Sequence, residues 1–197
     1  MNITTLSSAF TPPIRHLKTS FSSRSILPRN NDYLWKIEQG VVRIVTWHED
    51  GTIVTLGLWG VGAIIGTVLS KTEPYQIECL TKVELSAVEI QDSSELLQIL
   101  RLHLQRTEEL MVIRSHKTVE IMVIKLLEWL ANRFGREVQK GRLIDLRLTH
   151  QDIAETIGST RVTITRILQK LEEQGSIHRL RLHRIVLREE DIWHYEI

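Results

Sequence analysis

The segment from Thr149 to Gly175 constrains this chain most strongly, because it has the spacing of two short helices joined by a glycine turn. Thr149 and Asp152 stand three residues apart, as in a capping box, so a helix is predicted to begin near His150. Gly158 provides the conformational freedom that a tight turn into a second helix requires. The segment therefore predicts a helix-turn-helix.

The second helix is predicted to follow Ser159 or Thr160, either of which can cap it, and to end at a left-handed Gly175. Helical spacing gives it a core-facing side, made of Ile164, Ile167, Leu168 and Leu171. Its outward side consists of Arg161, Val162, Thr165, Arg166 and Gln169. Arginine can donate two hydrogen bonds to guanine O6 and N7, and valine can make an apolar contact with a thymine methyl group. The outward side is therefore predicted to contact DNA bases.

A basic segment follows the second helix. Basic and apolar residues alternate from Ser176 to Leu187, which predicts a two-stranded wing. From Gly158 to Arg184 six basic residues face two acidic ones, a local charge of +4 in a chain whose net charge is only +1. Concentrated positive charge is what phosphate neutralisation requires. Helix-turn-helix spacing alone also arises in helix corners without a DNA role, and the arginines and the wing favour DNA binding over that alternative.

The run IGSTRVTITRIL resembles the DNA-binding end of the cyclic-AMP receptor and fumarate-nitrate regulator (Crp/Fnr) superfamily, most nearly the cyanobacterial global nitrogen regulators. The resemblance implies that Arg161 and Arg166 contact bases, with Val162 between them. Many cyclic-AMP-type members have Glu at the position of Val162, and this departure points to the GTA and TAC half-sites of the nitrogen-regulator subgroup. Phosphate contacts are expected from Gln151, Ser159, Thr160, Thr163, Lys170 and Arg179.

Short strands are predicted from Phe21 to about Asp92. They include Val41 to Trp47, a turn at Glu49 to Gly51, and a returning strand from Thr52 to Leu58. Further β segments are expected at 75–79 and 83–88. The runs DYLWKIEQGVVRIVT and GVGAIIG resemble the cyclic-nucleotide-binding-like β-roll of the same superfamily, so the expected fold class is α+β, with a β-roll, a long helix and a winged helix-turn-helix.

The residues for a cyclic nucleotide are missing from this β-roll. Thr67 follows Gly66 where the superfamily pattern has a ribose-binding Glu, and the segment KTEPYQ offers Lys71 as the only nearby cation. Without a charged partner a phosphate loses its strongest bonds, so cyclic AMP is not expected to bind. The same absence weakens the case for 2-oxoglutarate. Arg114 and Lys117 remain weak effector candidates, and the alternative function is a β-roll that binds a small metabolite to control DNA binding.

A long helix is predicted from Ser94 to about Asn132, because neither Gly nor Pro interrupts this stretch. Its apolar residues follow heptad-like spacing, which predicts a homodimer interface that includes Leu110, Ile113, Ile124 and Leu127. A twofold dimer also matches a palindromic DNA site. The alternative is that this stripe packs within the chain. Lys117 with Glu120 is either a register device or an exposed salt pair.

The expected organisation is a flexible arm (1–20), a sensor-like β-roll (21–92), a dimerisation helix (93–135) and a winged helix-turn-helix domain (136–197). The arm is rich in Ser and Thr and lacks acidic residues, so a transit peptide remains a minor alternative. No stretch is apolar enough to span a membrane, and a cytoplasmic protein is expected. RNA polymerase is an expected further partner of the β-roll surface.

Cysteine and histidine usage argues against a cofactor. The single Cys79 excludes an internal disulfide and an iron-sulfur cluster, and its apolar neighbours predict a buried strand residue. The eight histidines are scattered without the spacing of a metal or catalytic motif. The sequence therefore predicts neither a metal site nor a cofactor, and no enzyme activity.

Overall fold

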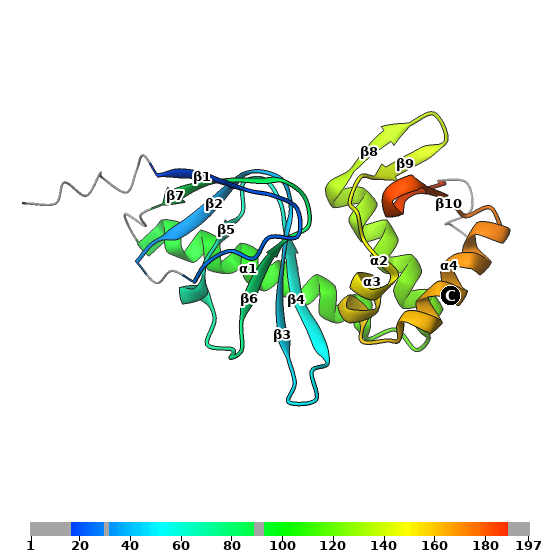
Figure 1. Ribbon diagram of the computed structural model, residues 1–197, viewed down its shortest axis with the longest axis horizontal. Coiled ribbons are helices and arrows are strands. Elements are labelled where there is room, and N and C mark those ends of the chain that lie inside the picture. The colour runs from blue at the N-terminus through cyan, green and yellow to red at the C-terminus, as the bar shows by residue number, and fades with distance from the viewer. Residues whose placement is uncertain (1–16, 30–31, 89–92, 189–197) are drawn as a thin grey trace, which may run out of the picture.

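The computed structural model describes residues 17–29, 32–88 and 93–188, which form two lobes joined by a long helix (Figure 1). The first lobe, residues 17–88, is a β-roll of short strands, and the second, residues 119–188, is a C-terminal domain of helices and a small sheet. This arrangement confirms the predicted α+β fold class.

Two antiparallel sheets make up the β-roll, with the strand orders β1-β7-β2-β5 and β4-β3-β6. The strand bounds are β1 (Lys18–Phe21), β2 (Leu34–Gln39), β3 (Val42–Trp47), β4 (Ile53–Trp59), β5 (Ile64–Ile65), β6 (Gln76–Cys79) and β7 (Val83–Val88), with a short 3-10 turn η2 (Thr67–Leu69). Alternate side chains point into the roll, where Ile37, Ile44 and Leu85 are almost fully buried. The roll thus has a core of its own.

The hairpin predicted in the roll is confirmed by the pairing of β3 with β4, in which Trp47 lies opposite Ile53. Its turn is closed by Asp50, whose Oδ1 accepts a hydrogen bond from the Thr52 N–H at 2.8 Å. Gly51 has a φ of 83°, a left-handed value that glycine adopts without strain. Strand β4 of this hairpin contacts the C-terminal domain, while its turn projects out of the roll (Figure 1).

The start of the roll differs from the sequence prediction. Strand β1 begins at Lys18 and pairs with β7, so that Lys18 lies opposite Ser86. Residues 18–20 are therefore part of the sheet, although they were assigned to the flexible arm. Residues 1–16 of that arm lie outside the described residues.

Two helices, α1 (Ser93–Arg114) and α2 (Val119–Phe134), replace the single helix expected from Ser94 to Asn132. Thr118 has an extended backbone, and its hydroxyl accepts a hydrogen bond from the Ile121 N–H at 3.3 Å. A threonine in this position caps a new helix. The prediction of one helix was wrong because this break involves no Gly or Pro.

The C-terminal domain packs α2 against a helix pair and an antiparallel sheet of order β10-β11-β9-β8. Its other elements are β8 (Gly135–Val138), β9 (Gly141–Ile144), α3 (His150–Ile157), α4 (Arg161–Glu173), β10 (Ile177–Leu180), the 3-10 turn η3 (Arg181–His183) and β11 (Arg184–Leu187). Leu127, Ile164 and Leu168 are fully buried in one core shared by α2 and α4. Helix α2 is thus part of the C-terminal domain.

The four residues predicted for the dimer interface lie inside this one chain. Leu110, Ile113, Ile124 and Leu127 are each no more than 6% exposed and belong to the core that continues from α1 into the C-terminal domain. A partner cannot reach them, so their heptad spacing reflects packing within the chain. The large apolar side chains that α1 exposes are instead Leu97, Leu100, Leu102, Leu104, Met111 and Val112.

Candidate DNA-binding site

Helix α3 begins and ends as the sequence predicts. The Thr149 hydroxyl accepts a hydrogen bond from the Asp152 N–H at 3.1 Å, and Asp152 Oδ2 accepts one from the Thr149 N–H at 2.7 Å. This is the predicted capping box. Gly158 is left-handed, and its N–H donates to the Ala154 carbonyl at 2.9 Å. The glycine turn thereby directs the chain into α4.

Helix α4 has the two faces that the sequence predicts. The Thr160 hydroxyl caps it by accepting from the Thr163 N–H at 3.2 Å. One face is buried, with Ile164 and Leu168 at 0% exposure. The opposite face is exposed to solvent and carries Arg161, Val162, Thr165, Arg166 and Gln169. Base contact requires accessible side chains, and all three predicted base-contacting residues are accessible.

Three of the predicted phosphate contacts are held by carboxylates of the same chain: Gln151 by Glu155, Lys170 by Glu120 and Arg179 by Glu172. The Lys170 Nζ lies 2.8 Å from Glu120 Oε1, so Glu120, which the sequence offered as a partner for Lys117, bonds to α4 instead. Exposed pairs of this kind contribute at most about 1 kcal/mol. A phosphate can therefore replace the Glu120 carboxylate as the partner of Lys170 at a modest cost in free energy.

The other predicted phosphate contacts are hydroxyls in the turn before α4 and in its first turn. Thr160 Oγ1 and Thr163 Oγ1 lie 2.9 Å apart, and Ser159 precedes them on the partly exposed turn. All three therefore lie near the N-terminus of α4. The positive end of a helix dipole favours an anion at this place.

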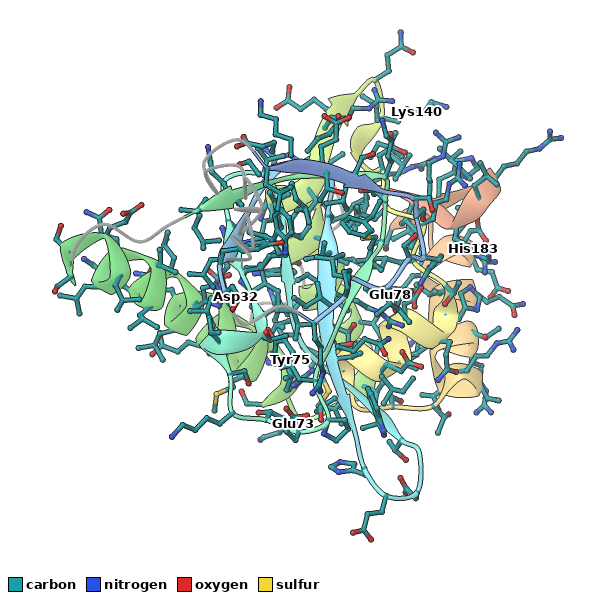
Figure 2. The ribbon with its side chains drawn as sticks, turned by 60° about the vertical axis from the view of Figure 1, so that its left-hand side comes forward. Asp32, Glu73, Tyr75, Glu78, Lys140 and His183 are labelled. Carbon is teal, nitrogen blue, oxygen red and sulfur yellow. The ribbon has the colours of Figure 1, made fainter. Side chains whose placement is uncertain are left out.

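The predicted wing is confirmed by the antiparallel pairing of β10 with β11. Its tip is η3, in which Leu182 and His183 have left-handed φ values of 63° and 58°. The His183 ring lies 6.4 Å from the ring of His150, the first residue of α3. The wing tip therefore lies beside the helix-turn-helix, and Figure 2 shows His183 on this side of the molecule.

A cluster of charged side chains, here called the ionic joint, connects the β-roll to α3 and consists of Arg24, Arg43, Glu78, Asp152 and Glu155. Arg43 Nη1 lies 2.7 Å from Glu155 Oε2 and 3.1 Å from Asp152 Oδ1. Its Nε lies 2.7 Å from Glu78 Oε2. The side chains of Arg43, Asp152 and Glu155 are no more than 8% exposed.

The charges of the ionic joint stabilise one another. Burial tends to raise the pKa of Asp152, but hydrogen bonds from Arg24 and the Thr149 N–H and the charge of Arg43 outweigh it and hold that pKa below its ordinary value. The hydrogen bond to Asp152 raises the pKa of Arg24 despite its partial burial. Sequence reasoning missed the joint, although Arg43 is the one charge within an apolar strand, a signal that predicts a buried acidic partner.

Arg114 was a candidate effector ligand, and its guanidinium joins the two lobes instead. Its Nε donates to the Thr156 carbonyl of α3 at 2.7 Å, and its Nη2 donates to the Thr55 carbonyl of β4. Lys117, the other candidate, is exposed in the short segment between α1 and α2. The two candidates therefore do not form one site.

Glu73 of the β-roll segment KTEPYQ forms an ion pair with Arg29 that the sequence did not reveal. Arg29 Nη2 lies 2.6 Å from Glu73 Oε2, so Lys71 is not the only cation nearby. Because Glu73 already binds this arginine, the pair presents no isolated positive charge to an anion. Tyr75 is buried next to it in the core of the roll.

Cys79 is fully buried, as predicted, and burial raises the pKa of its thiol to about 11. The thiolate is the reactive form of cysteine, so this thiol is inert at neutral pH. Within the described part of the chain, no group of three or more His, Cys, Asp or Glu residues has the placement of a metal site. Among the described helices, none has the length and apolar character to cross a membrane.

Comparison with known proteins places this geometry among transcription regulators. A model of the Crp-like helix-turn-helix domain matches residues 123–191. Regulatory protein CysR of Synechococcus elongatus is 44% identical over 162 residues, which cover 79% of this chain and 77% of CysR. The global nitrogen regulator of the same organism is 30% identical over 173 residues, with the same coverage. CysR is thus more similar to this chain than that nitrogen regulator is.

Solved structures share the fold over both lobes. A regulator of the CRP family from Thermus thermophilus has a TM-score of 0.74 at 21% identity, covering 87% of this chain and 92% of that protein. FixK2 from Bradyrhizobium japonicum has a TM-score of 0.73 at 20% identity, covering 88% of this chain and 92% of FixK2. At this identity the likeness concerns the fold alone.

Proposed function

The chain belongs to the Crp/Fnr family of transcription regulators, which are not enzymes, and from this premise we propose that it binds palindromic DNA sites as a cytoplasmic homodimer. The observation that carries the proposal is the solvent-exposed face of α4. Arg161, Val162 and Arg166 lie there, beside a basic wing and away from the buried core. A helix with this face fits the major groove, where base edges are accessible.

Base contacts are assigned to the first turns of α4. Arg161 and Arg166 are five residues apart on its exposed side, and Val162, at 65% exposure, lies between them. Arginine can form two bonds to one guanine, and valine contacts a thymine methyl group. These residues suit the GTA and TAC half-sites of the nitrogen-regulator subgroup, and the 30% identity to a global nitrogen regulator makes that site the first duplex to test.

Phosphate contacts are assigned to Gln151, Ser159, Thr160, Thr163, Lys170 and Arg179. The first four lie at or near helix N-termini, whose free N–H groups favour anions. Lys170 and Arg179 flank them from α4 and β10. Their present carboxylate partners, Glu120 and Glu172, are exchanged for phosphates when DNA binds.

The homodimer is assigned to the exposed side of α1. Leu97, Leu104 and Met111 recur every seven residues at 60–65% exposure, and Leu100 lies on the same side. An apolar seam with this period packs against a second copy of itself in a two-helix coiled coil. The seam replaces the four buried residues that the sequence nominated, and a twofold dimer would present two α4 helices to a palindrome.

DNA binding is proposed to be independent of cyclic AMP, because Thr67 and the Arg29–Glu73 pair offer the β-roll no site for its ribose and phosphate. A metabolite-binding β-roll is the second candidate, with 2-oxoglutarate as one metabolite to test. The Trp59 indole N–H favours it, being buried without a hydrogen-bond partner in the described structure. Such orphan donors are uncommon, and either a buried water or a polar ligand would satisfy this one. A thermal shift with 2-oxoglutarate, but not with cyclic AMP, supports this alternative.

The two hydrophobic cores support a division of the chain into regions with separate roles. Residues 17–88 are proposed as the sensor-like roll, whose outer surface is a candidate contact for RNA polymerase. Helix α1 is proposed as the dimerisation element. The DNA-binding domain then begins with α2, because α2 shares the core of α4 and the helix-turn-helix model already matches from residue 123.

The test is a fluorescence-anisotropy titration of the ligand-free protein with a duplex that carries palindromic GTA and TAC half-sites. A scrambled duplex of equal length and charge is the control, because phosphate contacts alone bind any sequence. Selective binding at physiological salt supports the proposal. Equal affinity for both duplexes, unchanged by candidate effectors, contradicts the assigned base contacts.

A further inference from the structure

Two histidines meet where the wing touches the helix-turn-helix. His150 opens α3 and His183 lies at the wing tip, with their rings 6.4 Å apart and inclined by 74°. They lie within the proposed DNA-binding face, since Arg161 of α4 and Arg179 of β10 are close enough for their charges to lower the pKa of His150. Neither histidine belongs to the contacts assigned so far.

Hydrogen bonds fix the tautomer of His150. Its Nδ1 lies 2.8 Å from Thr165 Oγ1, and that hydroxyl donates its own proton to the Arg161 carbonyl at 2.8 Å. The hydroxyl can therefore only accept from His150, so Nδ1 carries the ring proton. In the neutral ring the Nε2 atom is then an acceptor, which repels a phosphate. Protonation converts Nε2 into a charged donor, which binds one.

The surroundings of His150 favour its neutral form in the free protein. Burial lowers the pKa of His150, and Arg179, His183 and Arg161 lower it further through their positive charges. The nearby carboxylates are engaged elsewhere, because Glu172 binds Arg179 and Asp152 binds Arg24. Among the described residues no carboxylate is left to pair with this ring, and a DNA phosphate would place a negative charge against it.

We propose that His150 takes up a proton when DNA binds and then holds a backbone phosphate through Nε2, with His183 of the wing beside the same phosphate. This inference rests on the proposed DNA binding and adds a regulation to it: DNA affinity rises as the pH falls. Each proton taken up on binding increases the affinity by at most about tenfold per pH unit. An additional phosphate contact also steepens the salt dependence, by about 0.9 in the logarithmic slope for duplex DNA.

The experiment measures the affinity of the full chain for the palindromic and scrambled duplexes between about pH 6 and about pH 8, the range in which histidine titrates. We expect both affinities to fall by about three- to tenfold as the pH rises, since the phosphate contact does not depend on sequence. His150→Gln keeps a neutral hydrogen-bonding side chain and should remove most of this dependence. His150→Lys keeps a positive charge and should bind at about pH 8 as wild type does at about pH 6.

His48→Gln is the matched control, because His48 is an exposed histidine on the β3–β4 hairpin and should leave the pH profile unchanged. A wild-type profile that is flat, or one that persists in His150→Gln, overturns the inference while leaving selective DNA binding intact. The absence of selective binding at every pH and salt concentration contradicts the proposed function instead. The slope of the logarithm of affinity against the logarithm of salt concentration distinguishes a phosphate contact from a structural role. A phosphate contact makes this slope steeper at low pH in wild type but not in His150→Gln.

Discussion

Replacing Arg43 by Met tests whether the ionic joint fastens the DNA-binding domain to the β-roll. Arg43 is the centre of the joint, with Glu78, Asp152 and Glu155 all within 3.1 Å of its guanidinium. Methionine keeps much of the apolar volume of the side chain, so the substitution removes mainly the charge and its hydrogen bonds. The free energy of unfolding should therefore report on the joint.

The magnitude follows from which carboxylates lose their partner. Arg24 remains 3.1 Å from Glu78 and 2.6 Å from Asp152, so these two keep a cation. Glu155, at 8% exposure, keeps one partner among the described residues, the hydrogen bond from the Gln151 amide. Removing one partner of a buried pair costs about 3 to 5 kcal/mol. Because Arg24 and Gln151 remain, we expect the lower end of that range, about 3 kcal/mol.

The assay is urea unfolding at fixed protein concentration, followed by tryptophan fluorescence. Trp35 and Trp59 are buried in the β-roll and Trp129 lies in the C-terminal domain, so the signal covers both lobes. The double variant Arg43→Met with Glu155→Gln removes the orphaned charge and should recover about half of the loss. Arg29→Met breaks an exposed pair and should cost less than about 1 kcal/mol. The reasoning is refuted if Arg43→Met also costs less than about 1 kcal/mol, as expected for Arg29→Met. It is likewise refuted if the double variant recovers none of the loss.

Three further predictions follow. Arg161→Ala should weaken binding by about 1 to 3 kcal/mol and relax the preference at one base pair, measured by titration with single-base variants of the duplex; a uniform loss across all sequences would argue for a phosphate contact instead. Leu104→Asp should weaken the dimer by at least about tenfold without loss of folding, since this side chain is 60% exposed, and light scattering with circular dichroism separates the two effects. The lowered pKa of Asp152 stabilises the fold above its ordinary value near 3.8, and that stability is lost as the pH falls through the lower folded value. Asp152→Asn should therefore flatten the acid side of the stability profile, and an unchanged acid transition would contradict it.

The helix-turn-helix was predictable because its determinants are local. The Thr149 capping box, the Gly158 turn and the two faces of α4 depend on residues within a few positions of one another. The α1–α2 break was not, because only the single capping residue Thr118 marks it. The heptad pattern showed that Leu110 and its neighbours are buried, but the spacing of residues does not say whether the burying surface belongs to the same chain.

The ionic joint lay beyond sequence reasoning for a different reason. Arg24 and Asp152 are 128 positions apart, and a pattern within either segment cannot reveal that they meet. Only the placement of Arg43 inside an apolar strand hinted that an acidic partner exists. The same holds for the histidine pair, since His150 and His183 come together through the packing of the wing.

The position of the joint limits how a signal from the β-roll can control DNA binding. Helix α3 is held on one side by Arg43 and Arg114, while the exposed face of α4 remains open. The docked arrangement therefore leaves the α4 face accessible, and docking alone does not block it. A ligand shifts an equilibrium only by its difference in affinity between the two states. An effector of the β-roll must then bind differently when α3 is docked and when it is released, so weakening the joint through Arg43 should change effector affinity as well as stability.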